Sequence, residues 1–293
     1  MSFPNLPKTF KYINKLSQEI IFEWDHGFLP EKPQGIDVLT ISHAEAQGIN
    51  QVGSTIQSSN VQSRVVNMSG RIVGNNQTQK KDLLLSVVRP DLTGRLYADD
   101  FYLDVVPSST PTFEAREINA SYQFSLLAAY PYWQKDESAT ATLSGVQKRF
   151  RLMNEYGQKQ WWINDPAKYR FGIVVSAQFI NINNTGQVPI PFTVIFKALD
   201  TVTNPKLIHV ATNKFLLLSK TLVAGETVTV EITHDRTYVT SSVDGECRGA
   251  LDLGSSFNRL EVGDNVIKPE ASSGKADLLV QMDYATEIVG IAL

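Results

Sequence analysis

The segment INASYQFSLLAAYPYWQ (residues 118–134) carries two signals that decide how this chain folds. Tyr122, Phe124 and Leu126 alternate with polar residues, which is the period of a β-strand with one buried face. The alternation stops at Pro131, because proline has no N–H to extend a ladder and holds the preceding residue extended. The segment therefore predicts a strand that ends at a corner.

An aromatic cluster surrounds this proline, made of Tyr130, Tyr132 and Trp133. Such a cluster is compatible with a sugar-stacking platform, a corner of a hydrophobic core, or the seam between two subunits. We favour a structural corner or an interface over a ligand site, because proline ends the strand at this point.

Strand-like alternation recurs along the chain and predicts a mainly β protein. Turn sequences rich in glycine, asparagine and aspartate separate the runs. A single stretch, residues 78–91, has helical spacing instead, with Leu83 and Leu84 set four residues before Val87 and Val88; Thr78 is its expected N-cap. The alternating runs lie at residues 20–24, 101–105, 122–126, 171–179, 192–196, 228–232 and 278–284.

The composition changes near the middle of the chain. Residues 134–145 are small and polar, which predicts a linker between two domains, 1–140 and 141–293. The first is expected to be β-rich with one helix, and the second almost wholly β. At 293 residues the chain is long enough for each domain to bury a core of its own.

The overall composition is that of a soluble globular protein, with 42% hydrophobic and 19% charged residues. A net charge of −3 gives no electrostatic reason to expect a nucleic-acid partner. We also expect no membrane span, since no apolar run is long enough, and no secretory signal. The lone Cys247 predicts neither disulfides nor a cysteine metal site, as in a protein made in a reducing cytoplasm.

The search for catalytic chemistry finds no recognisable pattern. The four histidines are scattered, and nucleophile-elbow, Walker and dinucleotide motifs do not occur in the sequence. A cation site at Asp99, Asp100 and Asp104 is conceivable, but a solvated strand edge is favoured. Carboxylates for a glycosidase are interpreted as surface groups; they are Glu226, Glu231, Glu246 and Glu261. We expect no enzyme activity, no metal and no cofactor.

A second aromatic pair, Trp161 and Trp162, is the other candidate site. Neighbouring residues of a strand point to opposite faces, so at least one ring would face away from its own sheet. A core or interface role is favoured, and a saccharide platform in the second domain is the alternative.

Several motifs, in order, resemble those of the distal tail protein (Dit) family of long-tailed phages that infect Gram-positive bacteria. The segment at 118–134 resembles the end of that family's first domain. The segment INNTGQVPIPFTVIF at 182–196 resembles the entry to a strand of its second domain. Phe257, Leu260, Gly263 and Asn265 match its Phe-x-x-Leu-x-x-Gly-x-Asn motif. Further similar segments are YINKLSQEIIFEW, RVVNMSGRIVGNN, the P-T-F-E stretch, the hairpin around AGET and MDYATEIVGI.

The resemblance implies a ring-forming (belt) domain followed by a galectin-like or carbohydrate-module-like β-sandwich. It further implies a structural hub of the virion tail tip, assembled with identical copies into a hexameric ring. The implied partners are the tail tube protein, the tape-measure protein and the tail-associated or receptor-binding proteins. Binding of host-wall saccharide is the alternative function. No catalytic residue is required for the hub role.

Overall fold

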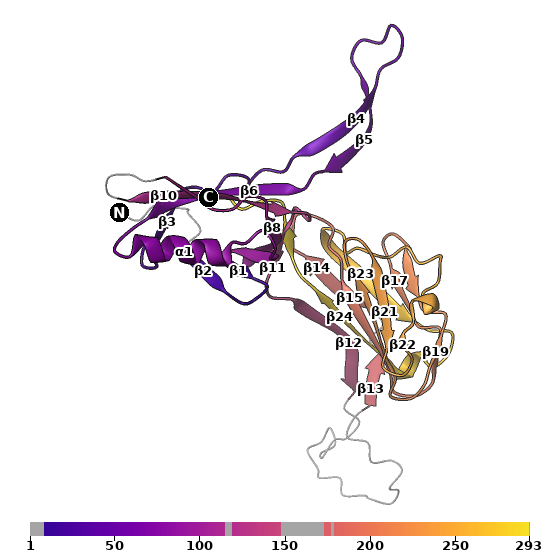
Figure 1. Ribbon diagram of the computed structural model, residues 1–293. Helices are drawn as coiled ribbons and strands as arrows, with labels where there is room; N and C mark the ends of the chain where they lie inside the picture. Colours follow the sequence, from indigo (N-terminus) through magenta and orange to yellow (C-terminus); the bar gives the residue numbers. More distant parts are fainter. Residues whose placement is uncertain (1–8, 115–118, 148–172, 177–178, 293) are drawn as a thin grey trace, which may run out of the picture. The chain divides into compact units, whose positions relative to one another are not determined.

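The chain is divided into two compact units, Met1–Glu137 with Glu287–Leu293, and Ser138–Thr286 (Figure 1). The computed structural model describes residues 9–114, 119–147, 173–176 and 179–292. The passage between units lies close to the expected boundary at residue 140. The end of the chain differs from the expected division, because its last strand pairs within the first unit and does not stay with the second.

The first unit is built on one antiparallel sheet with the order β2-β1-β7-β8-β10-β6-β3. Alternating apolar residues on these strands share one core, which includes Tyr12, Phe22, Leu96, Phe124 and Trp133. The strands are β1 (Phe10–Asn14), β2 (Glu19–Phe22), β3 (Phe28–Pro30), β6 (Arg64–Ile72), β7 (Gly94–Ala98), β8 (Phe101–Pro107), β9 (Thr112–Glu114), β10 (Ala120–Ala128), β11 (Trp133–Lys135) and β25 (Glu287–Ile288).

Helix α1 (Gln77–Val87) packs on this sheet as the sequence predicted, but its details differ. Its N-cap is Asn76 and not Thr78. Asn76 adopts the left-handed conformation, which asparagine tolerates better than threonine, so the helix begins earlier. Leu84 and Val87 are buried, whereas Leu83 is 45% exposed because it lies on the outer side of the helix.

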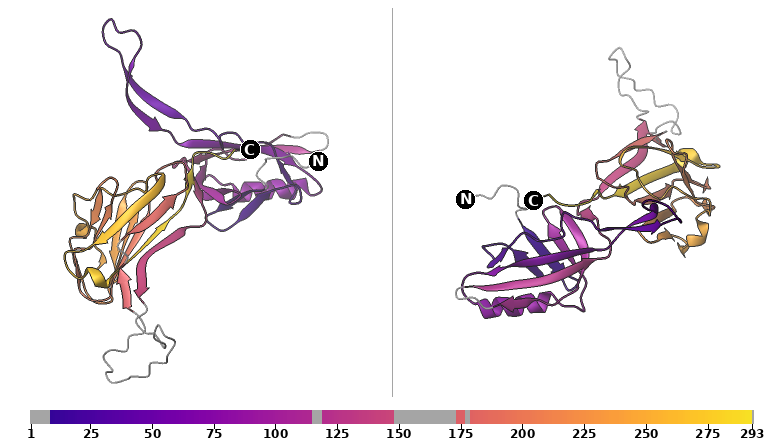
Figure 2. Two further views of the ribbon diagram at one scale, coloured as in Figure 1. Left: turned by 180° about the vertical axis from the view of Figure 1, so that it is seen from behind. Right: turned by 90° about the horizontal axis from the view of Figure 1, so that it is seen from above.

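A long hairpin leaves the first unit, made of β4 (Ile41–Ala46) and β5 (Thr55–Val61) (Figures 1 and 2). We call residues 41–61 the arm. All residues of its two strands are exposed except Ala46, which is half-buried. The arm was not predicted from the sequence, because its apolar alternation is weak and neither of its strands buries a face.

The second unit contains a seven-stranded sheet, a four-stranded sheet and a strand pair β16–β19. Buried residues of both large sheets form one core, as in a β-sandwich. The sheet orders are β13-β12-β24-β15-β20-β21-β22 and β14-β23-β17-β18. The bounds are β12 (Ala139–Gln147), β13 (Ile173–Ser176), β14 (Ile180–Asn184), β15 (Thr193–Ala198), β16 (Val202–Thr203), β17 (Lys206–His209), β18 (Phe215–Leu217), β19 (Thr221–Leu222), β20 (Thr227–Ile232), β21 (Thr237–Ser241), β22 (Gly245–Glu246), η2 (Arg248–Ala250), β23 (Gly263–Glu270), η3 (Lys275–Asp277) and β24 (Leu278–Tyr284).

Two sequence predictions about local structure are wrong. The segment 134–145 is not a linker: it falls mostly in β11 and β12, with a short bend at 136–138 between them. Threonines and alanines of β12 pair with β24, since β-branched threonine fits a pleated edge even without strong apolar alternation. Trp24 does not continue β2. It lies in the turn after Phe22 and is 64% exposed.

Candidate functional site

The aromatic corner connects β10 to β11 and is centred on a buried tryptophan at the start of β11. Pro131 is buried, and the Trp133 side chain is fully buried in the core of the first unit. The indole N–H of Trp133 donates a hydrogen bond to the carbonyl oxygen of Ile36 at 3.0 Å. A ring enclosed in this way cannot stack on a sugar, so the arrangement supports a structural role for Trp133.

The two tyrosines of the corner are only half-buried. Their rings meet edge to face, 5.3 Å apart between centroids. The hydroxyl of Tyr130 donates a hydrogen bond to the carboxylate of Glu287, which is almost fully buried. Strand β25 pairs with β11 at Trp133 and Gln134, so the end of the chain completes the corner. No motif in the sequence indicated the role of Glu287.

Arg64 holds three segments of this corner together. Its guanidinium donates hydrogen bonds to the carbonyl oxygens of Pro131 and Gly35, each at 2.7 Å, and to that of Val289. Its side chain is almost fully buried, and this burial lowers the pKa of Arg64 to about 10, although nearby Asp37 acts in the opposite direction. Arg64 was not among the residues that the sequence motifs singled out.

A sequence signal for Arg64 nevertheless exists. Arg64 is in phase with Val66, Met68 and Ile72, which all face the core from β6. A charged residue in the buried phase of a strand needs internal hydrogen-bond partners, because desolvation of an unpaired charge costs too much free energy. Here those partners are backbone carbonyls.

Next to the corner, the outer surface of the first unit is hollowed into a groove of about 530 Å³. Tyr130 lines one end of it, together with Ile13, Val106 and Leu127. Arg95 lies at the rim and is bridged to Asp104 at 2.9 Å. The corner therefore has a buried side that holds the fold and an exposed side that borders an apolar surface.

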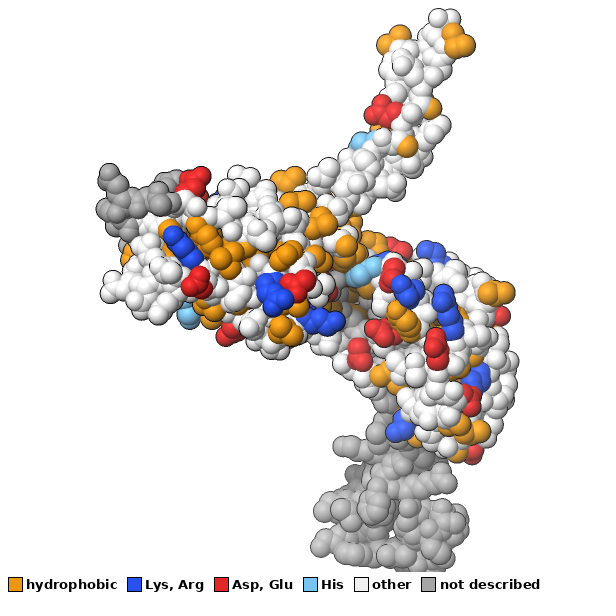
Figure 3. Space-filling model, viewed as in Figure 1, with side chains coloured by type: hydrophobic (Ala, Val, Ile, Leu, Met, Phe, Trp, Pro, Cys, Tyr) orange, Lys and Arg blue, Asp and Glu red, His pale blue; other side chains and the backbone are white. Residues whose placement is uncertain are grey.

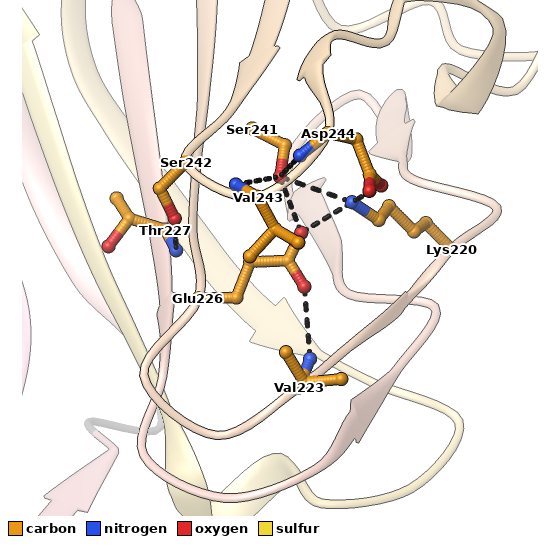
Figure 4. Close-up of polar contacts among 8 residues, drawn as sticks. All are labelled: Lys220, Val223, Glu226, Thr227, Ser241, Ser242, Val243 and Asp244. Atoms are coloured by element: carbon orange, nitrogen blue, oxygen red, sulfur yellow. Dashed lines mark hydrogen bonds and ion pairs between the residues drawn. The ribbon is translucent and has the colours of Figure 1, made fainter.

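The second unit contains a separate polar cluster, which ties together the turns around β20 and β21 (Figure 4). Lys220 donates hydrogen bonds to Glu226 and, at 3.2 Å, to the hydroxyl of Ser241. Ser241 donates to Glu226 at 2.6 Å, and Lys220 lies 2.6 Å from Asp244. The backbone amide of Val223 donates to the other oxygen of Glu226 at 3.0 Å.

The charge states of this cluster do not suit serine–lysine catalysis, in which a neutral lysine must take the serine proton. Burial alone would lower the pKa of Lys220, but hydrogen bonds and charge from Asp244 and Glu226 outweigh it, so the pKa is raised. Burial would raise the pKa of Glu226, but Lys220, Ser241 and the Val223 amide together lower it. Lysine stays protonated, and the cluster acts as a buried clamp between turns.

Glu226 is therefore a correction to the sequence analysis, which treated it as a surface group. It is only 3% exposed, because three hydrogen-bond donors around it compensate for its desolvation. Glu231, Glu246 and Glu261 are exposed as expected.

The other candidates do not assemble into a chemical site. Asp99 and Asp100 border a small pocket with Asp136 and Glu137, whereas Asp104 lies at the groove and is bridged to Arg95. Over the described ranges, no group of three or more His, Cys, Asp or Glu side chains could hold a metal ion. Within the same ranges, no helix is long and apolar enough to cross a membrane. Trp161 and Trp162 lie outside the described residues.

Comparisons with known proteins agree with this picture. Residues 185–287 match the family model described as the siphovirus-type tail component, C-terminal domain. A search of curated proteins gave no significant match. The fold resembles that of the SPP1 Dit protein, described as a paradigm of the hub adsorption apparatus in phages that infect Gram-positive bacteria. That similarity has a TM-score of 0.67 at 12% identity and covers 95% of this chain and 98% of the other.

A chain of the phage P2 baseplate in its activated conformation with Ca is a more distant structural match. It has a TM-score of 0.45 at 9% identity and covers 95% of this chain and 97% of that one. The family match covers most of the second unit, and the shared fold with SPP1 Dit extends over nearly the whole chain. Together they agree with the resemblance that the sequence motifs indicated: residues 185–287 match a siphovirus-type tail component domain, and the chain shares the fold of a distal tail protein.

Proposed function

We propose that this protein is a structural hub of the tail tip that assembles through its first unit into a closed ring, a hexamer by family resemblance. The observation that carries the proposal is the SPP1 Dit fold over nearly the whole chain, together with the tail-component match in the second unit. The ring joins the tail tube and the tape-measure protein to the distal tail-associated or receptor-binding proteins. The proposed role is architectural and needs no enzyme activity.

The exposed surface of the first unit supports assembly with other chains. Its arm is exposed along both strands, and the groove beside Tyr130 is apolar. Large exposed apolar surfaces on soluble proteins commonly mark protein contacts. A head-to-tail contact between identical copies closes into a ring when its rotation divides a full turn.

The test is the mass and shape of the purified full-length protein, by light scattering and negative-stain electron microscopy. We expect a discrete species of six chains with a central opening, and binding of this species to the purified tail tube protein of the same virus. A protein that stays monomeric at all concentrations, with and without the tube protein, would contradict the ring. A ring that does not bind the tube protein would contradict the hub role but not the ring.

A further inference from the structure

The groove of the first unit continues into a row of exposed apolar side chains. Val65, Leu127 and Val106 lie directly opposite one another across β6, β10 and β8, so they share one face of the sheet. They are 46%, 36% and 41% exposed. Figure 3 shows hydrophobic side chains gathered at the foot of the arm. The chain's own arm therefore leaves this apolar row uncovered.

The composition of the arm is unusual for a hairpin exposed to water. Its residues 41–61 include one carboxylate, Glu45, and no lysine, arginine or proline. Exposed strands normally carry such residues to prevent pairing with other chains, and an isolated two-stranded hairpin is at best marginally stable in water. These properties indicate that the arm is covered by protein in the assembled state.

One face of the arm combines apolar groups with the carboxylate. The register pairs Ile41 with Val61 and, beyond a shift between Ala44 and Glu45 that skips Gln57 of β5, Glu45 with Ile56. No residue of β4 is skipped, so alternation along β4 places Ile41 and Glu45 on the same side. Ile41, Ile56 and Val61 are 51%, 58% and 41% exposed. Glu45 accepts a hydrogen bond from Ser54 within the arm, which leaves its other oxygen for a partner.

The groove has the complementary charge. Its charged lining residues are Lys15, Arg95 and Asp104. The guanidinium of Arg95 is already bridged to Asp104 and lies over the ring of Tyr102 at 4.4 Å. The exposed ammonium of Lys15 therefore gives the groove a net positive charge next to Ile13 and the apolar row.

We infer that the arm of one copy docks into the groove of the neighbouring copy in the ring. Its apolar face covers the row Val65, Leu127 and Val106, and Glu45 lies against Lys15. The inference rests on the proposed ring, and it names the two surfaces that make the head-to-tail contact. These surfaces are different parts of one unit, as a heterologous interface requires.

Charge reversal tests this contact in the full-length protein. Lys15→Glu and Glu45→Lys are each expected to raise the concentration at which half of the rings dissociate by about tenfold, because each places like charges together. The double variant is expected to restore the wild-type value. Lys197→Glu and Glu231→Lys, on exposed positions of β15 and β20 in the second unit, are the matched controls and are expected to leave the value unchanged.

The outcomes separate the contact from the ring itself. Docking of the arm in the groove would be overturned if neither single reversal changed the concentration at which half of the rings dissociate, or if the double variant did not restore it. The proposal of a ring would not be affected by either result. A wild-type protein that forms no ring would contradict the ring, and with it the proposal that the arm of a neighbouring copy occupies the groove. Circular dichroism of each variant checks that a variant that no longer forms rings is still folded.

Discussion

At the scale of single residues, the first unit depends on a few polar side chains placed inside an apolar core. Arg64 links Gly35, Pro131 and Val289, which are far apart in sequence. No local pattern predicts such a set of acceptors, because they are backbone carbonyls whose position depends on the complete fold. The sequence identifies Arg64 as a buried-phase residue, but only the structure identifies its partners.

Arg64→Ala is expected to destabilise the first unit by about 3 kcal/mol or more, since hydrogen bonds from charged donors are strong and three buried carbonyls lose their partner. The control is Arg71→Ala on the same strand. Arg71 is half-exposed and lies 3.9 Å from Glu31, so its loss is expected to cost about 1 kcal/mol or less. Urea unfolding measures both, and equal midpoints for the two variants would refute a special role for Arg64.

At the scale of elements, the sequence predicted what alternation and spacing encode. The buried residues of β8, β10, β15, β20 and β24 follow the expected period of two, and α1 lies where helical spacing places it. Elements with little apolar alternation in their sequence were among those it missed. They include the arm, whose strands are exposed, and β12, whose strand character is evident from its pairing with β24.

Two glycines show how tyrosine packing shapes the first sheet. Tyr122 lies opposite Gly70 on β6, and a Cβ on Gly70 would meet the Tyr122 hydroxyl at 2.5 Å and the Leu29 carbonyl oxygen at 2.3 Å. Gly94 lies opposite Asn14 on β1, and a Cβ on Gly94 would meet the hydroxyl of nearby Tyr12 at 2.6 Å. Glycine at these sites leaves room for a flat aromatic ring.

Gly70→Ala is therefore expected to destabilise the first unit by about 1–3 kcal/mol, as overpacking of a core does. Tyr122→Phe alone is expected to be nearly neutral, because its buried hydroxyl has no hydrogen-bond partner among the described residues. The double variant is expected to stay destabilised, since the Leu29 carbonyl is backbone and cannot move away. Gly249→Ala is the control for thermal unfolding, because no atom of the described residues, apart from its neighbours in the chain, lies within 4 Å of its Cβ position. Full rescue in the double variant would show that the tyrosine hydroxyl alone causes the clash.

At the scale of the whole molecule, the chain passes between its two units twice, after Glu137 and after Thr286. The small, polar composition of residues 134–145 suggested the passage after Glu137, but the composition of the chain did not suggest the passage after Thr286. The final segment resembles a terminal strand of a sandwich, and no local feature shows that it continues into the first unit. Its role there depends on the pairing of β25 with β11 and on hydrogen bonds from Tyr130 and Arg64. A division of the chain at one linker therefore separates parts that belong together.

We propose that Ser138–Thr286 is the autonomous second unit, and fragments test this division. That fragment is expected to be soluble and to unfold cooperatively, because it holds both sheets and their common core. A fragment of residues 145–293 is expected to aggregate instead. It lacks Ala139–Leu143, the part of β12 that pairs with β24, so the edge of β24 is left open for other chains. Size-exclusion chromatography and circular dichroism compare the two. Equal solubility and equally cooperative unfolding of the two fragments would show that the beginning of β12 is dispensable. The second unit would then begin in the middle of β12.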